Sequence, residues 1–95
     1  KFPTEYKLKQ NYPNPFNPKT TINYAIGKDG FVNLSVFDIT GKFIKTLVHK
    51  NQSQGLHFSD WNGRDATGEN VVSGIYLIKI EIDDFSQSRK MILLK

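Results

Sequence analysis

The stretch GIYLIKIEI, residues 74–82, decides the fold class of this chain of 95 residues. Apolar side chains recur at every second position from Tyr76 to Ile82, and Lys79 and Glu81 fall on the opposite face. Successive side chains of a β-strand point to opposite faces of its sheet, so this period of two indicates a half-buried strand. The stretch therefore predicts a strand that covers a core with one face and meets solvent with the other.

Further strands are predicted on both sides of this stretch. The same alternation occurs at 22–26 and at 32–39, and Thr40 and Gly41 then form a turn that leads into an apolar-rich strand at 43–48. A last strand at 88–94 would pair with 75–82 across Asp83 and Asp84. Because that pair is not a favoured two-residue hairpin turn, we expect a longer loop or a bulge there. A strand near 56–61 carries apolar groups on both faces.

The segment NYPNPFNP, residues 11–18, contains three prolines that exclude a helix or a central strand. We call this segment the strap. Its asparagines can bond to nearby backbone in place of the donors that proline lacks, and Tyr12 and Phe16 are expected to anchor it on the core. The strap is therefore predicted to close one edge of the fold without offering ladder donors, which would keep molecules from pairing edge to edge.

About seven short strands without a helical pattern predict an all-β fold, an antiparallel sandwich of two sheets formed by one domain, residues 1–95. Trp61 and other aromatic residues are expected between the sheets. The chain has no cysteine, so neither a disulfide nor a thiolate site contributes. No apolar run approaches the roughly 18 residues that a membrane-spanning helix needs.

The net charge of +4 comes from 13 basic and 9 acidic residues. The lysines are spread singly along the chain and arginine occurs only at 64 and 89, so we expect a solvated surface and no nucleic-acid partner. His49 and His57 have no nucleophile in a recognisable motif, and Asp83 and Asp84 would point apart in a strand. The sequence therefore predicts a domain that is not an enzyme and binds no cofactor.

The loop at 60–74 is the richest in polar groups. Asp60, Asn62, Asp65 and Glu69 could offer oxygen ligands to calcium, although their spacing fails the EF-hand pattern and Arg64 adds a positive charge. Alternatively, the loop forms two glycine-containing turns in which Asn62 and Asp65 bond local backbone. Both interpretations stay open, and the sequence favours the turns.

Five motifs together resemble one known family. They are LKQNYPNPFNPKTTINY at 8–24, VFDITGK at 36–42, WNGRDATG at 61–68, SGIY at 73–76 and KMILLK at 90–95. In this order they resemble a type A C-terminal sorting domain, which marks cargo of the type IX, or Por, secretion system of Bacteroidota. The resemblance covers residues 8–95, nearly the whole chain.

The resemblance implies an immunoglobulin-like sandwich related to the module of the flagellar hook-capping protein, a FlgD-like fold. It implies a C-terminal signal that sends a larger cargo protein through the periplasm to the cell surface or medium. The implied partners are the outer-membrane translocon, a sortase-like peptidase and the cargo domain upstream. Residues 1–7 would then be the remnant of a linker.

Carried over by position, Gly74 and Tyr76 match the G-x-Y element of the family, and Lys90, Leu94 and Lys95 match its basic-apolar-basic tail. The resemblance implies that these five residues take part in recognition by the translocon. Structural roles compete for the first two, because Gly74 can be a turn residue at the start of a strand and Tyr76 a core aromatic.

The sequence departs from the family at two positions. Ser59 stands where an apolar strand residue is usual, and Asn62 replaces the usual aspartate. Neither position lies in the G-x-Y element or the tail.

Two functions remain open. In the first, residues 92–95 form a sheet edge to which a receptor adds a strand. In the second, the domain is a structural or carbohydrate-associated immunoglobulin-like module of an extracellular enzyme. The terminal position of KMILLK favours the sorting signal.

Overall fold

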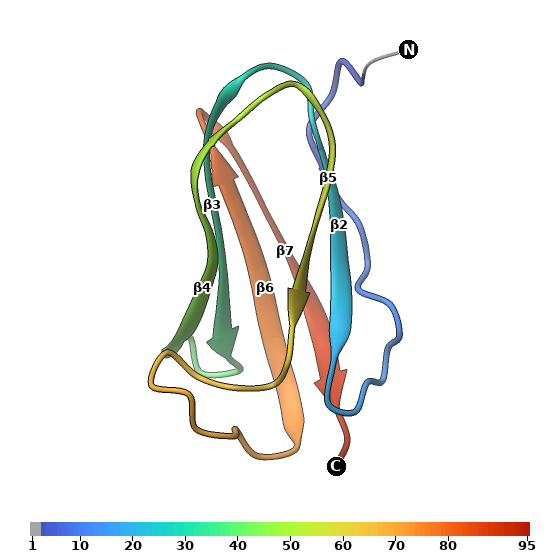
Figure 1. The fold of residues 1–95 in the computed structure, drawn as a ribbon, viewed down its shortest axis with the longest axis vertical. Helices are drawn as coiled ribbons and strands as arrows, with labels where there is room; N and C mark the ends of the chain where they lie inside the picture. Colours follow the sequence, from blue (N-terminus) through green and yellow to red (C-terminus); the bar gives the residue numbers. More distant parts are fainter. Residues whose placement is uncertain (1–2) are drawn as a thin grey trace.

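Two antiparallel sheets pack face to face in the computed structural model, which describes residues 3–95 (Figure 1). The three-stranded sheet has the order β1-β2-β5, and the four-stranded sheet has the order β4-β3-β6-β7. Residues 3–95 contain no helix, so the all-β sandwich is confirmed. The strands are β1 (Lys7–Leu8), β2 (Thr20–Ile26), β3 (Gly30–Asp38), β4 (Phe43–Gln52), β5 (Gly55–Trp61), β6 (Gly74–Ile82) and β7 (Phe85–Leu93).

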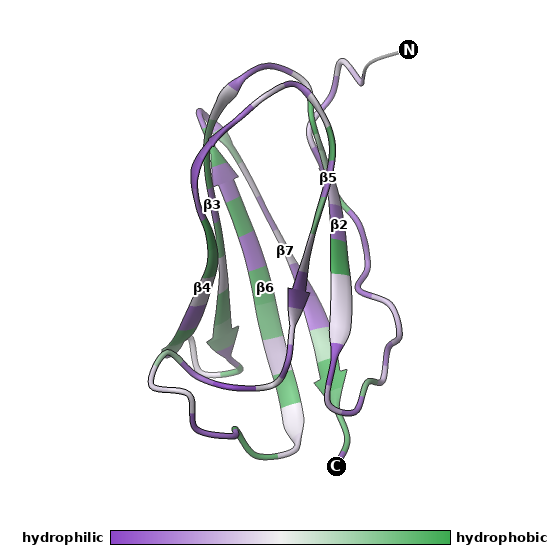
Figure 2. Cartoon of the chain, in the orientation of Figure 1, coloured by the Kyte–Doolittle hydropathy of each residue, from purple (hydrophilic) through white to green (hydrophobic). Residues whose placement is uncertain are grey.

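The core lies between the sheets and is built by the alternating positions that the sequence predicts. On β6, Tyr76, Ile78, Ile80 and Ile82 are buried. Figure 2 shows hydrophobic and hydrophilic bands alternating along this strand. The Trp61 ring is 1% exposed, and the ring centroids of Phe16 and Tyr76 lie 5.7 and 5.4 Å from it. The prediction that aromatic residues fill the space between the sheets is therefore confirmed.

Strand β5 has a defined orientation that its sequence left ambiguous. Trp61 points into the core, whereas Leu56 and Phe58 are 72% and 69% exposed. These three residues cannot all face inward, because 56 and 58 differ from 61 in parity along the strand. The larger indole ring takes the core position, and β5 therefore carries two exposed apolar side chains.

The hairpin between β6 and β7 is tighter than we expected from its sequence. Ile82 pairs with Phe85, so Asp83 and Asp84 alone form the turn and β7 begins at residue 85 instead of 88. The expectation of a longer loop was wrong. Asp83 has a φ of 51°, a left-handed conformation that aspartate tolerates better than most residues. The Tyr6 hydroxyl also donates to the Asp83 carboxylate at 3.1 Å.

Strands β3 and β4 form the predicted hairpin, but their pairing is irregular. The register shifts between Leu34 and Ser35 and again between Val36 and Phe37. The shifts leave Leu47 and Ile44 of β4 without a paired residue on β3, which are two β-bulges. Because β4 is the outer strand of its sheet, both bulges lie on an edge.

The strap crosses from one sheet to the other. Tyr12 exchanges two backbone hydrogen bonds with Thr21 of β2, and Phe16 then forms a parallel bridge with Leu93 of β7. Phe16 is 2% exposed, as expected for an anchor, but Tyr12 is 79% exposed, so that part of the prediction was wrong. Asn11 takes the inward position beside Tyr12, where its amide donates to Thr20 Oγ1 at 3.0 Å.

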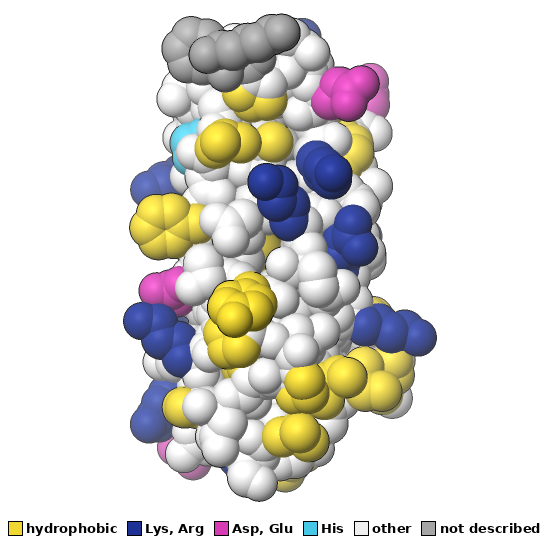
Figure 3. Space-filling model, turned by 90° about the vertical axis from the view of Figure 1, so that its right-hand side faces the viewer, with side chains coloured by type: hydrophobic (Ala, Val, Ile, Leu, Met, Phe, Trp, Pro, Cys, Tyr) yellow, Lys and Arg dark blue, Asp and Glu magenta, His cyan; other side chains and the backbone are white. Residues whose placement is uncertain are grey.

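The face that carries β2 and the strap shows scattered hydrophobic side chains with Lys and Arg side chains between them (Figure 3).

The first described residues lie at one end of the long axis and the last at the other (Figure 1). Residues 1–2 are outside the described part. Before β1, Tyr6 stacks on Phe85 at 5.2 Å, and Gln54 donates to the Pro3 carbonyl. No helix in the described part of the chain has the length and apolar character to cross a membrane.

Candidate functional site

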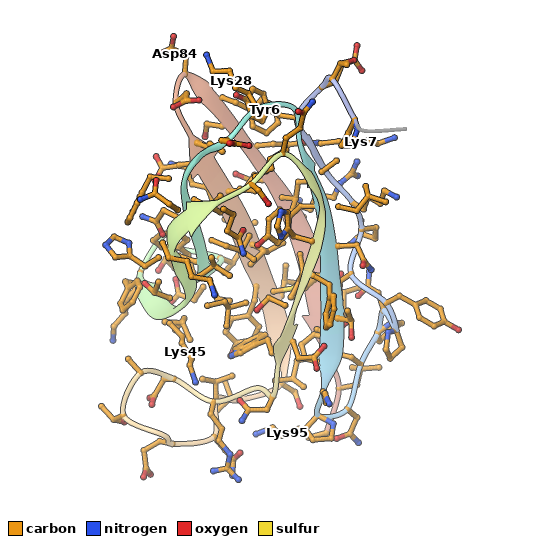
Figure 4. All side chains as sticks on the ribbon, turned by 45° about the horizontal axis from the view of Figure 1, so that its top comes forward. Tyr6, Lys7, Lys28, Lys45, Asp84 and Lys95 are labelled. Atoms are coloured by element: carbon orange, nitrogen blue, oxygen red, sulfur yellow. The ribbon has the colours of Figure 1, made fainter. Side chains whose placement is uncertain are left out.

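The pairing of β6 with β7 brings together the two motifs that the sequence placed about 15 residues apart. Gly74 pairs with Leu93 and Tyr76 with Met91, so the G-x-Y element lies beside the tail. The backbone N–H of Lys95 also donates to Ser73 Oγ at 3.0 Å. We call this end of the molecule, formed by residues 73–76 and 91–95, the tail end. Figure 4 shows Lys95 there and Tyr6, Lys28 and Asp84 at the opposite end.

Tyr76 is a core residue with a structural contact of its own. Its side chain is 4% exposed and packs edge-on against Trp61. Its hydroxyl donates to the Val72 carbonyl at 2.6 Å and so fixes the loop that precedes β6. Burial raises the pKa of this phenol, and the negative charge of Asp38 raises it further. A partner cannot reach most of the Tyr76 side chain in the folded domain.

Gly74 opens β6 in a conformation that favours glycine. Its φ is 157°, and a Cβ atom built there would meet no atom within 4 Å. Packing alone therefore does not require glycine at this position, and backbone conformation is its structural contribution.

The tail alternates between buried and exposed side chains. Met91 and Leu93 are fully buried in the core, whereas Ile92 and Leu94 are 38% and 53% exposed. Strand β7 ends at Leu93, so Leu94 and Lys95 extend beyond the sheet. Lys90 is also exposed and pairs with Leu77 of β6. The three predicted tail residues, Lys90, Leu94 and Lys95, thus all present side chains at the surface.

The outer edge of β7 is not free, which contradicts the expectation that a receptor adds a strand there. Phe16 donates its backbone N–H to the Ile92 carbonyl at 2.9 Å and accepts the Leu94 N–H at 3.0 Å. The Ile92 N–H donates to Asn14 Oδ1 at 2.9 Å, and Gln10 Nε2 donates to the Lys90 carbonyl at 2.7 Å. The strap thus occupies the backbone groups that an added strand would use.

Three of the four calcium candidates in the 60–74 loop, Asp60, Asn62 and Asp65, bond to neighbours within the protein. Asp60 accepts the Thr21 hydroxyl at 2.6 Å and lies 3.3 Å from Lys19 Nζ, and both contacts lower the pKa of its carboxyl. Asn62 Oδ1 accepts the Arg64 N–H at 3.2 Å, while Asp65 bonds inside its own turn. Within residues 3–95, no three His, Asp or Glu side chains gather as a metal site would require. The geometry matches the turn interpretation.

Two loops share one construction that sequence reasoning missed. In DITGK at 38–42, Asp38 Oδ1 accepts the N–H and hydroxyl of Thr40 and the N–H of Lys42. In DATGE at 65–69, Asp65 accepts the equivalent groups of Thr67 and Glu69. The repeated D-x-T-G pattern was visible in the sequence, with aspartate and glycine at turn positions.

The second loop is bonded to strand β4, which follows the first loop. The Ala66 N–H of the second loop donates to the Ile44 carbonyl, which lies at a bulge of edge strand β4. A hollow of about 350 Å³ nearby is lined by residues of the first loop and by residues 71–76. Both aspartates have a lowered pKa, chiefly because a threonine hydroxyl donates to each.

The fold and the loops define an immunoglobulin-like β-sandwich domain. Residues 20–84 match the FlgD Ig-like domain family, and the chain belongs to this family. A search of curated proteins finds no match.

Three solved structures share the fold. The chain is similar to a part of dimeric latent PorU from Porphyromonas gingivalis, with a TM-score of 0.73 at 17% identity, and to a part of PorZ from the same organism, with 0.60 at 23%. It is also similar to FlgD from Xanthomonas campestris, with 0.64 at 24%. Each similarity covers 95% of this chain, but only 9% of PorU, 11% of PorZ and 67% of FlgD. At these identities the similarity shows the fold alone.

Proposed function

We propose that this domain is a sorting signal that directs a larger cargo protein through the type IX secretion system. The observation that carries the proposal is the tail end, where the G-x-Y element, anchored by the buried Tyr76, lies beside a tail whose Leu94 and Lys95 are exposed beyond the last strand. The motif resemblance supports it, as does the shared fold with PorZ, which is described as an essential surface component of that system.

In this proposal the partners are the outer-membrane translocon, a sortase-like peptidase and the upstream cargo. The domain is folded in the periplasm during transit and then reaches the cell surface or the medium. It has no catalytic role, and its own chemistry is binding. Recognition uses exposed side chains, because the strap occupies the backbone edge of β7.

The tail residues suit recognition by side chains. Lys95 offers a point charge, Leu94 an apolar contact next to it, and Lys90 a second charge on the outer face of the sheet. Gly74 and Tyr76 then act indirectly, since they shape the start of β6 against which the tail is held. Tyr76 is a positioning residue in this account.

A second candidate is a structural or carbohydrate-associated module. It is favoured by Phe58, which is 69% exposed on the outer face of β5, next to Leu56. Exposed aromatic rings on a flat sheet can hold sugars, but a sugar site also needs polar groups that fix the ligand. The sorting signal accounts for the tail and this alternative does not.

A fusion experiment separates the two functions. Residues 1–95 are fused to a fluorescent protein directed to the periplasm of a bacterium that has this secretion system. The test variant carries Leu94→Ser and Lys95→Gln. These changes leave the buried Leu93 in place, whereas deletion of residues 92–95 would remove it from the core. The matched control carries Tyr12→Ser and Lys9→Gln, which are also an exposed aromatic or apolar residue and an exposed lysine.

The proposal predicts surface fluorescence for the wild type and the control and its loss in the tail variant, with equal thermal unfolding of all three. Retention of every fusion in the periplasm would contradict the sorting signal and favour the accessory module. Equal surface display of all three would show that Leu94 and Lys95 are not the recognised residues.

A further inference from the structure

The outer face of the four-stranded sheet is divided into an apolar half and a polar half. Phe43, Phe37, Leu77 and Lys90 pair in one row across the four strands. The next row toward the tail end contains the pair Ile75 and Ile92. In the opposite direction the row is Thr46, Ser35, Lys79 and Ser88. Figure 2 agrees, since the hydrophilic bands on β6 lie in its upper part.

We call the surface formed by Phe37, Phe43, Ile75, Leu77 and Ile92 the apolar face. Phe43 is 49% exposed, Ile75 43% and Ile92 38%, while Phe37 and Leu77 are half-buried. The rings of Phe37 and Phe43 meet edge to face at 6.1 Å. Single exposed apolar residues are ordinary, but contiguous ones on all four strands mark an interaction surface.

A hollow within this region gives the surface a shape that a partner can recognise. Its volume is about 280 Å³, and it is lined by Phe37, Gly41, Leu77, Lys79 and Ser88. Such a hollow has room for one large side chain, and protein interfaces commonly centre on an anchor residue in a pocket of this kind. A membrane surface would gain nothing from the hollow, so its presence favours a protein.

The charges beside the apolar face indicate which kind of protein partner can bind there. Lys79 and Lys90 both lie on this face of the sheet, and the acidic Glu81 lies one row further away, 3.6 Å from Lys79 Nζ. A symmetric contact between two copies of this face would bring lysines together, which is unfavourable. The basic border instead complements a partner with carboxylates around its apolar anchor.

We infer that the apolar face is a docking surface for a protein partner that inserts an apolar side chain into the hollow beside Phe37 and Leu77 and places carboxylates opposite Lys79 and Lys90. This inference rests on the proposed function, in which the partner is a component of the secretion machinery. The domain is then held at two places, by its tail and by this sheet face. An upstream cargo domain is a poor candidate for the occupant, because the chain enters the sandwich at the opposite end (Figure 1).

The test uses the same fluorescent fusion with a matched pair of variants. Phe43→Gln with Leu77→Gln removes apolar surface from the four-stranded sheet. Leu56→Gln with Phe58→Gln removes two exposed apolar side chains from β5 in the other sheet. We expect surface display to fall at least about tenfold in the first variant, the effect of losing about 1.4 kcal/mol or more of binding, and to be unchanged in the second.

Thermal unfolding of the purified domains shows whether each variant still folds. A second variant, Lys79→Gln, tests the same surface independently. This change removes one charge from the border without touching the apolar core, and we expect it to lower display as well. If the wild type and the tail-dependent loss behave as proposed while the apolar-face variants are displayed normally, this inference is wrong and the sorting signal stands. If the wild type itself is not displayed, the proposed function fails first.

Two further measurements identify a different occupant. Sedimentation of the wild-type domain that shows a dimer, dispersed by Phe43→Gln with Leu77→Gln, would overturn the inference in favour of a second copy. Binding to phosphatidylglycerol vesicles that the same variant abolishes would overturn it in favour of a membrane surface. Monomeric domain without vesicle binding, together with the loss of display, supports a protein partner.

Discussion

On one side of the sandwich, β1 of the first sheet lies beside β7 of the second, and hydrogen bonds join the two strands. On the other side, between β4 and β5, the sheets leave a cleft. On the closed side, Arg89 Nε donates to the Leu8 carbonyl at 2.7 Å, and the Leu8 N–H donates to Gln87 Oε1 at 2.9 Å. On the open side, a cleft of about 430 Å³ lies between Lys45 of β4 and Asp60 of β5.

The difference shows two ways to prevent edge-to-edge pairing. Strand β4 has two bulges, which distort the edge that a neighbouring strand would need. Strand β7 is regular and is covered by the strap instead. The hydrogen bonds between the strap and β7 also fix the residues that follow this strand, so the strap holds the exposed tail in one place. The bulged edge instead holds a loop, because the Ile44 carbonyl accepts the Ala66 N–H.

The largest expected effect comes from the anchor of the strap. Phe16→Ala removes a buried ring that packs on Trp61, and we expect the free energy of unfolding to fall by about 3–5 kcal/mol. Tyr12→Ala is the matched control, since this exposed ring should change stability by no more than about 0.5 kcal/mol. Urea unfolding checks both, and equal losses would show that the strap is not anchored as described.

The next test concerns the prolines of the strap. Replacing Pro13, Pro15 and Pro18 by alanine restores three backbone donors beside a sheet edge. We expect increased self-association, because these donors offer a neighbouring molecule ladder partners. Sedimentation velocity measures it. A triple variant that stays monomeric at every concentration at which the wild type does would refute this role.

A smaller effect is expected from one side-chain amide. Asn14→Ala leaves the Ile92 N–H without its acceptor, and a hydrogen bond of this kind contributes about 1 kcal/mol. Asn17→Ala, in the same segment, has no such contact with β7 and serves as the control. Stability should fall in the first variant only. The same loss in both would point to a general effect on the strap.

The acid sensitivity of folding should depend on the two D-x-T-G loops, at 38–42 and 65–69. Hydrogen bonds to Asp38 and Asp65 hold their pKa values below the unfolded value of about 3.9, so both carboxylates stabilise the fold above that pH and lose this contribution as the pH falls through their folded pKa values. Asn at both positions keeps an acceptor without the titration. Between pH 7 and pH 3, the urea midpoint should therefore drop more for the wild type than for Asp38→Asn with Asp65→Asn.

The sequence predicted the strands where one face is buried, since a period of two follows directly from burial, as on β6. Prediction from the sequence failed where the structure depends on which of two neighbouring residues faces inward, or on the local geometry of a turn. Tyr12 is exposed because Asn11 takes the inward position, and the Asp83–Asp84 turn is tight because aspartate tolerates a positive φ. The D-x-T-G loops could have been recognised from their repetition.

The candidate site was predictable in its residues and not in its surroundings. The motifs identified Gly74, Tyr76 and the tail, and strand pairing explains why they meet. The contact of the strap with β7 could not be predicted from the sequence. Asn14 and its partner Ile92 are 78 positions apart, and periodicity carries no information on such contacts.

Amide hydrogen exchange tests the closed edge of β7 most directly. We predict that the N–H groups of Ile92 and Leu94 exchange at least about a hundredfold more slowly than in the unfolded chain, because Asn14 and Phe16 accept their hydrogen bonds. In Phe16→Ala their protection should fall. Exchange of both amides near the unfolded rate in the wild-type domain would contradict the account, and strand addition to the tail would again be the better explanation of recognition.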